Sequence, residues 1–226
     1  MDEKQHIIFD LDGTLIETRE RHWRVYKRVT LELGGKPLPL PVYWRLKRKK
    51  QSTLYLVKKS GLPKKYTDQY LKRFITLIEK PDYQILDTCF PFTHTVLNSL
   101  AYVYRLHLVT VRRDKKALLG QLKRLSLTKY FSTTLAQAPA GDPAQTKKVL
   151  IQSLHIAPIM VIGDTEADIE TATLLGTKSI GVASGIRTAS VLKRTNPTHI
   201  VGDIRGVLRI IRQIQTNLPA GGPTNE

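Results

Sequence analysis

Two aspartates one residue apart are the first residues in the chain that could do chemistry together. Asp10 and Asp12 follow the apolar residues 7–9, a run typical of a strand buried on both faces of a parallel sheet. Alternation along an extended chain points both carboxylates to the same side. The carboxyl ends of such strands face the crevice where open α/β sheets bind ligands. The alternative is an ordinary strand that ends in a turn at Gly13.

A second acidic segment follows another apolar run. Asp164 comes directly after Gly163 and the run 159–162, and Asp168 stands four residues further on, on the same face of a helix that begins here. Gly163 permits a close backbone approach. Carboxylates from two strand ends form an oxygen-only site that suits a hard divalent cation, Mg²⁺. The alternative is that Asp164 caps the helix while Asp168 faces solvent.

Together these segments resemble the haloacid dehalogenase superfamily, closest to its phosphoglycolate phosphatase-like branch with a helical cap. The resemblance implies that Asp10 is the nucleophile and forms an aspartyl-phosphate. It implies that Asp12 is the acid for the leaving group and then the base for water. It also implies that Asp10, the backbone carbonyl of Asp12 and Asp164 hold Mg²⁺, with Asp168 in support.

This spacing makes chemical sense for phosphoryl transfer. A carboxylate that attacks a phosphate dianion needs a cation to offset the repulsion between them. Two carboxyls as close as Asp10 and Asp12 are expected to titrate as a coupled pair, and one retained proton suits acid catalysis.

Thr110 ends the apolar run 106–109. It matches the family position whose hydroxyl hydrogen-bonds the transferred phosphoryl group; the alternative is a threonine selected for β propensity. With Gly13 in the turn after the first strand, Thr110 is a predicted substrate-binding residue. Arg112 or Arg113 could reach the phosphate, although we favour the start of a surface helix at this place.

The family also needs a fixed positive charge that bridges the nucleophile and the phosphoryl oxygens. Lys147 fits this position best and is our predicted catalytic and substrate-binding lysine, with Lys148 as the alternative.

Composition limits the remaining possibilities. The chain has 226 residues, 41% of them hydrophobic, which suits one core with an insertion or two small domains. The single cysteine, Cys89, excludes an internal disulfide framework and fits a reducing compartment. Because the start lacks an apolar leader and no run reaches about 18 apolar residues, we expect a cytoplasmic protein that does not enter a membrane.

We expect an α/β fold with a Rossmann-like three-layer core around a parallel sheet, and an inserted all-helical cap. The core is predicted at 1–15 and 91–216, the cap at 16–90 and a flexible tail at 217–226. Helices are expected in the cap at 16–34, 42–60 and 66–80, with a loop at Pro37, Pro39 and Pro41. In the core we expect helices at 93–104, 114–126 and 166–175, and strands at 5–10, 106–111, 131–135, 179–182 and 198–201, the last at an edge.

The net charge is +17, and residues 16–90 alone contain 18 Lys and Arg against 7 Asp and Glu. A basic surface attracts phosphorylated small molecules, but it also fits nucleic acid or another polyanion. The basic run 45–50 could form a solvated helix face, line the cleft or bind a polyanion outside it. We predict a Mg²⁺-dependent phosphomonoester hydrolase that acts on a small phosphorylated metabolite. The alternatives are a phosphomutase with the same site, or a nucleic-acid-binding protein on the same fold.

Overall fold

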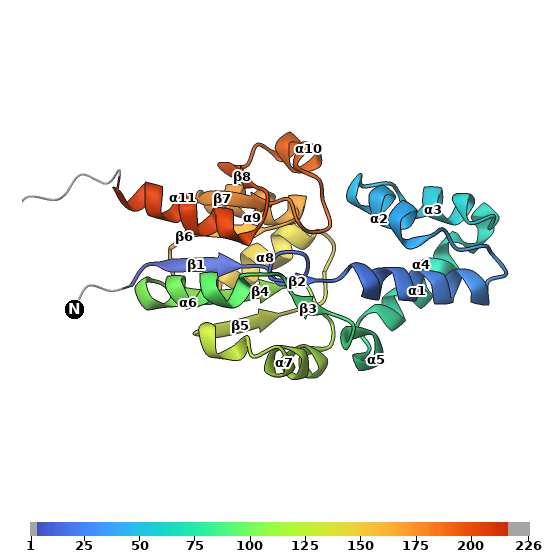
Figure 1. Ribbon diagram of the computed structural model, residues 1–226, viewed down its shortest axis with the longest axis horizontal. Coiled ribbons are helices and arrows are strands. Elements are labelled where there is room, and N and C mark those ends of the chain that lie inside the picture. The colour runs from blue at the N-terminus through green and yellow to red at the C-terminus, as the bar shows by residue number, and fades with distance from the viewer. Residues whose placement is uncertain (1–3, 217–226) are drawn as a thin grey trace, which may run out of the picture.

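The computed structural model describes residues 4–216, and within them six parallel strands form one sheet (Figure 1). The strand order is β5-β4-β1-β6-β7-β8, with β8 at the edge as expected. The central strand β1 pairs in parallel with β4 on one side and β6 on the other. The strands are β1 (His6–Phe9), β4 (Arg105–Thr110), β5 (Thr133–Ala136), β6 (Pro158–Gly163), β7 (Lys178–Val182) and β8 (His199–Val201).

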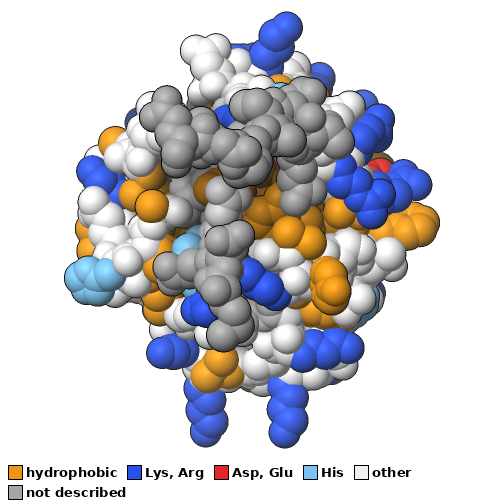
Figure 2. Space-filling model, turned by 90° about the vertical axis from the view of Figure 1, so that its left-hand side faces the viewer, with side chains coloured by type: hydrophobic (Ala, Val, Ile, Leu, Met, Phe, Trp, Pro, Cys, Tyr) orange, Lys and Arg blue, Asp and Glu red, His pale blue; other side chains and the backbone are white. Residues whose placement is uncertain are grey.

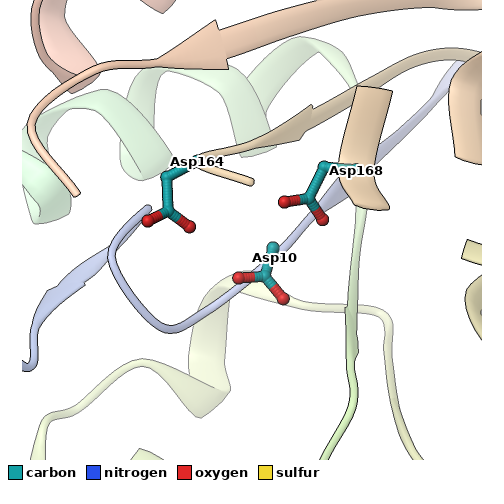
Figure 3. A group of neighbouring side chains, drawn as sticks. All are labelled: Asp10, Asp164 and Asp168. Carbon is teal, nitrogen blue, oxygen red and sulfur yellow. The ribbon is translucent and has the colours of Figure 1, made fainter. Parts of the chain in front are cut away.

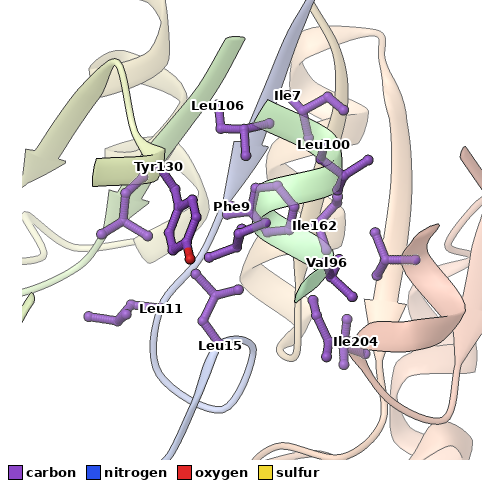
Figure 4. Packing of buried hydrophobic residues seen from close by; sticks show 14 of the residues in the cluster. Ile7, Phe9, Leu11, Leu15, Val96, Leu100, Leu106, Tyr130, Ile162 and Ile204 are labelled. Carbon is purple, nitrogen blue, oxygen red and sulfur yellow. The ribbon is translucent and has the colours of Figure 1, made fainter. Parts of the chain in front are cut away.

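Helices cover both faces of this sheet. Side chains alternate along β1, so Ile7 and Phe9 enter the larger hydrophobic cluster while Ile8 enters a smaller one on the other face (Figure 4). The larger cluster packs against α6 (Thr93–Val103), α7 (Lys115–Arg124) and α11 (Ile204–Thr216), and the smaller against α8 (Pro143–Gln152) and α9 (Glu166–Leu175). The expected three-layer α/β core is therefore confirmed.

The helices between β1 and β4 have a hydrophobic cluster of their own, in which Tyr26 stacks on Tyr43 with ring centroids 4.3 Å apart. They lie beyond the carboxyl ends of the strands (Figure 1). We propose that this cluster marks the helical cap. The helices are α1 (Arg19–Glu32), α2 (Leu40–Arg48), α3 (Thr53–Lys59), α4 (Thr67–Ile78) and α5 (Pro81–Gln84).

Several expected boundaries in this part of the chain were wrong. Residues 16–17 form β2 (Ile16–Glu17), which pairs antiparallel with β3 (Thr88–Cys89) where the chain enters and leaves the helices. The helix expected at 42–60 is two helices, because the chain turns at Lys50 with a φ of 59°. Pro41 lies in the first turn of α2 rather than in a loop, where its missing N–H costs no hydrogen bond.

The remaining elements are short or agree with expectation. The helix predicted at 166–175 has these bounds, whereas the strand expected at 131–135 begins at Thr133. Single turns occur at η1 (Lys64–Tyr66), η2 (Thr128–Tyr130), η3 (Lys193–Thr195) and α10 (Ala189–Leu192). The expected tail at 217–226 lies outside the described residues. Among the helices of the described part, none has the length and apolar character needed to span a membrane.

The positive charge is spread beyond the cap. Figure 2 shows the face at the amino ends of the strands, opposite the cap, where Lys and Arg side chains surround scattered hydrophobic residues. A net charge of +17 attracts anions to the protein.

Candidate active site

Three buried carboxylates meet at the carboxyl ends of β1 and β6. Oxygen atoms of Asp10, Asp164 and Asp168 all lie within 4.8 Å of one another (Figure 3). The side chains come from the end of β1, the end of β6 and the first turn of α9. The structure therefore brings together three of the four residues predicted to hold the metal.

Sheet geometry explains this meeting. Because β1 and β6 are hydrogen-bonded neighbours, with Asp10 N donating to Ile162 O at 2.9 Å, their carboxyl ends lie side by side. Asp10 is two residues after Ile8, so it faces the side of the sheet that α8 and α9 cover. Asp168 is fixed by a capping box: its Oδ2 accepts hydrogen bonds from Thr165 N at 3.0 Å and Thr165 Oγ1 at 2.7 Å. Thr165, rather than Asp164, is thus the N-cap.

Lys147 joins the carboxylates from α8. Its Nζ donates to Asp10 Oδ1 at 2.6 Å and to Asp168 Oδ1 at 2.5 Å, and the side chain is buried. The helix begins at Pro143 after the N-cap Asp142, so Lys147 lies one turn into it on the face toward the sheet. This geometry favours Lys147 over Lys148, which is only half-buried.

The charges at this site do not balance. Burial raises the pKa of Asp10 to about 6 against the opposing effect of Lys147, and the charges of Asp168 and Asp12 add to the rise. Burial, followed by the charges of Asp10 and Asp168, raises the pKa of Asp164 well above its usual value. One lysine therefore faces three carboxylates that are almost entirely buried. A divalent cation would relieve this repulsion and favour the ionised carboxylates.

The backbone makes room for Asp164. A Cβ at Gly13, whose φ is +81°, would lie 2.0 Å from Asp164 Oδ2, and a Cβ at Gly185 would lie 2.1 Å from the same oxygen. Asp164 accepts hydrogen bonds from Thr14 Oγ1 at 3.3 Å and Ile186 N at 2.5 Å. Gly13 thus lies against the carboxylate group. The three carboxylates and the two glycines around Asp164 fit a small, hard cation.

Asp12 has different partners. Its Oδ1 accepts hydrogen bonds from Arg21 Nη2 and from Arg112 Nη2 (2.6 Å), and its Oδ2 accepts one from Arg112 Nε at 2.6 Å. Burial acts to raise the pKa of Asp12, but Arg112 and Arg21 outweigh it and hold the pKa below its usual range. The arginines therefore favour the ionised form of Asp12, and the negative charge of Asp12 in turn adds to the rise in the pKa of Asp10.

The cleft above these residues has a volume of about 400 Å³. Asp10, Asp12, Thr110 and Lys147 all line it. Thr110 is buried at the last position of β4. All four residues predicted to be catalytic therefore line the same cavity.

The cap reaches this cleft through Lys50. Its Nζ lies 2.8 Å from Glu166 Oε1, while Arg187 Nε donates to Glu166 Oε2 at 2.8 Å, and all three line the cleft. Arg48 donates to the carbonyls of Ala183 and Arg187. The basic run 45–50 thus contacts the core at the cleft, although Arg45 and Lys49 are exposed.

The sequence analysis missed one arginine at the site, Arg21, and favoured a surface position for another, Arg112. Arg112 was expected at a surface helix start, but it is 4% exposed and holds Asp12, whereas Arg113 has a side chain 45% exposed. Arg21 is 2% exposed. The sequence did contain a signal that Arg21 is buried. It lies four residues before Val25 and eight before Val29, and this spacing puts it on the buried face of the same helix.

The chain matches the family model described as haloacid dehalogenase-like hydrolase over residues 7–182. It is 23% identical to the phosphorylated carbohydrates phosphatase of Thermotoga maritima, over 92% of this chain and 98% of that one. It is 23% identical to the pyrophosphatase PpaX of Oceanobacillus iheyensis, over 91% of this chain and 95% of that one.

Solved structures share the fold. A haloacid dehalogenase-like family hydrolase of Streptococcus pneumoniae superposes with a TM-score of 0.75 at 21% identity, over 93% of this chain and all of that one. A second match, titled a predicted phosphatase from Clostridium acetobutylicum, has a TM-score of 0.74 at 19% identity, over 93% of this chain and 99% of that one.

A substitution at Gly185 tests whether the space that the two glycines leave for Asp164 matters for the metal. In Gly185→Ala the new methyl group would meet Asp164 Oδ2 and Gly13 O, at 2.1 and 2.2 Å, so the carboxylate must move. We expect the Mg²⁺ concentration for half-maximal phosphatase activity to rise at least about tenfold, a change of 1.4 kcal/mol, with the circular dichroism spectrum unchanged.

Gly120→Ala is the matched control, because a Cβ there meets nothing within 4 Å and the residue lies inside α7. This variant should keep the Mg²⁺ requirement and gain about 0.5–1 kcal/mol of stability. If both variants had the same Mg²⁺ requirement, the claim that Gly185 makes room for a metal-binding Asp164 would be contradicted.

Proposed function

The chain belongs to the haloacid dehalogenase-like hydrolase family and is a phosphatase, and we propose that it hydrolyses phosphomonoesters with Mg²⁺ through an aspartyl-phosphate on Asp10. The observation that carries the proposal is the contact of Lys147 with Asp10 and Asp168 beside the buried Asp164. Asp10 and Lys147 line the same cleft, and Asp164 and Asp168 lie next to Asp10, which supports a nucleophile, a fixed positive charge and a metal acting together.

In the first step, an oxygen of Asp10 attacks phosphorus, and the bond from phosphorus to the leaving oxygen breaks. Lys147 Nζ, 2.6 Å from Asp10 Oδ1, offsets the negative charge that gathers on the phosphoryl oxygens. Thr110, at the end of the neighbouring strand β4, supplies a hydroxyl to orient the phosphoryl group. Asp10, Asp164, Asp168 and the backbone carbonyl of Asp12 would hold Mg²⁺, which supplies further charge neutralisation when bound.

In the second step, water attacks the phosphorus of the aspartyl-phosphate and returns Asp10 with release of inorganic phosphate. Asp12 in the ionised form that Arg21 and Arg112 favour is the base that accepts the proton of this water. For the protons to balance, we propose that Asp12 enters the first step protonated, gives this proton to the leaving alkoxide, and is returned to the protonated form when it accepts the proton of the attacking water.

The substrate we propose is a small phosphorylated metabolite. A cleft of about 400 Å³ is within the range of small-molecule sites. The relatives named above are a pyrophosphatase and a phosphatase of phosphorylated carbohydrates. Lys50 and Arg187 at the cleft add positive charge that attracts such anions. The free Cys89 fits a reducing compartment, and we propose the cytoplasm.

Asp10→Asn tests the nucleophile. The amide keeps the size of the side chain but is a far weaker nucleophile, so phosphatase activity should fall by at least about 1,000-fold while the thermal unfolding midpoint shows that the fold remains. Asp82→Asn, at an exposed aspartate of α5, is the control and should retain full activity. Release of inorganic phosphate by the wild type separates a phosphatase from a phosphomutase, and full turnover by Asp10→Asn would refute the assignment.

Lys50→Gly separates a role in binding from a role in the fold. Lys50 adopts a left-handed conformation two residues after the last residue of α2, where glycine is the favoured residue. In its ion pair with the buried Glu166 the lysine side chain is itself 61% exposed, so we expect the pair to contribute only on the order of 1 kcal/mol to stability. We therefore expect equal or greater thermal stability together with a KM raised about tenfold.

His155→Gly is the matched control. His155 is exposed and left-handed with a φ of 52°, and it follows α8 outside the cleft residues. It should give a similar change in stability with an unchanged KM. A KM unchanged in Lys50→Gly as well would show that Lys50 has no part in substrate binding.

A further inference from the structure

Positive charge is concentrated in one stretch of the helices between β1 and β4. Residues 45–73 contain 11 Lys and Arg but only one acidic residue, Asp68. Arg48 and Lys50 contact the core at the cleft, and Arg73 has a carboxylate partner on α1. Seven of the cations are exposed and form no ion pair within residues 4–216: Arg45, Lys49, Lys58, Lys59, Lys64, Lys65 and Lys72.

Five of these seven cations lie on three elements that pack against one another, α3, η1 and α4. Leu56 and Val57 of α3 and Tyr70 of α4 enter the hydrophobic cluster between the helices, so the exposed lysines lie on the outer side. We call this surface the basic cap face, formed by Lys58, Lys59, Lys64, Lys65 and Lys72. Lys65 and Lys72 also line a shallow groove of about 500 Å³ along α4.

The stability of the helices does not explain this charge. Lys58 and Lys59 are the last residues of α3, where the helix dipole favours cations. Lys64 and Lys65, in contrast, come directly before α4, at the end where the dipole favours anions. Because neighbouring lysines also repel one another, a bound polyanion would relieve an unfavourable arrangement of the free protein.

Aromatic rings lie among these lysines. Lys59 Nζ is 5.7 Å from the centroid of the Tyr55 ring, and Lys65 Nζ is 5.3 Å from that of Tyr66. Tyr55 is 37% exposed, so part of its ring is accessible from solvent. Lysines that contact backbone phosphates and aromatic rings that stack on bases are the two components of single-strand recognition. Binding to a membrane surface instead needs a continuous apolar helical face, whereas α3 exposes only Leu54 and Tyr55 of its large hydrophobic residues.

We propose that the basic cap face binds single-stranded nucleic acid, with phosphates on its lysines and a base stacked on Tyr55. None of its five lysines lines the cleft that holds the candidate active site. The surface is thus a second binding site, which does not depend on the proposed phosphatase function.

The test measures binding of a fluorescein-labelled oligouridylate of about 16 nucleotides, without a terminal phosphate, to the full-length protein. Fluorescence anisotropy gives Kd at several salt concentrations. In Lys58→Gln/Lys59→Gln/Lys64→Gln/Lys65→Gln we expect Kd to rise at least about tenfold. The dependence of log Kd on log salt concentration should become shallower, because fewer counterions are released.

The matched control replaces four exposed lysines of the core with glutamine. None of the four has an ion-pair partner among the described residues: Lys115, Lys116, Lys123 and Lys129. This variant loses the same four charges, but its Kd should stay within about twofold of the wild-type value. Equal losses of affinity in the two variants would show a diffuse attraction by the whole protein and would overturn the proposal.

Tyr55→Leu tests the stacked base. Leucine keeps an apolar side chain but has no ring, so Kd should rise at least about fivefold with an unchanged salt dependence. The thermal unfolding midpoint of each variant checks that the helices remain folded. An unchanged Kd in Tyr55→Leu, which would indicate a polyanion without bases, would overturn the proposal. So would a wild type that does not bind the oligouridylate at low salt, whether or not it binds phosphatidylserine vesicles.

Discussion

The structure depends on burial of three carboxylates beside a single lysine. In water the three carboxylates would repel one another only weakly. At the ends of β1 and β6 they are enclosed by strands, helices and glycine backbone, where the repulsion is stronger. Lys147 compensates one charge by bonding both Asp10 and Asp168. The remaining negative charge is what the proposed cation would offset, and the proposed attack of Asp10 on a phosphate depends on that compensation.

The parallel sheet brings these carboxylates together because the carboxyl ends of its neighbouring strands lie along the same edge. Alternation directs Asp10 to the face that carries Lys147, while the neighbouring strand delivers Asp164 at the same level. Helix α9 adds Asp168 through its own capping box. The chemistry is therefore built from the ends of regular elements, which hold side chains more firmly than loops do.

These positions were predictable from sequence because strand-end carboxylates follow recognisable apolar runs. Asp10, Asp164 and Asp168 were found in this way, and Lys147 was preferred over Lys148 through a family resemblance. Arg112 was misplaced because a charged residue before a helix usually faces solvent, and its partner Asp12 is 100 residues away. The strands β2 and β3 were missed because two residues show no periodicity. The break in the cap helix depends on the left-handed Lys50, which no local pattern marked.

The central claim is that the carboxylate group binds a divalent cation, and the thermal unfolding midpoint measured against Mg²⁺ without substrate tests it most directly. A cation that binds only the folded state raises the midpoint as its concentration exceeds the dissociation constant. At constant ionic strength the wild type should show a saturable rise that Asp164→Asn lacks. A wild-type midpoint that is insensitive to Mg²⁺, or an equal rise in Asp164→Asn, would contradict the account.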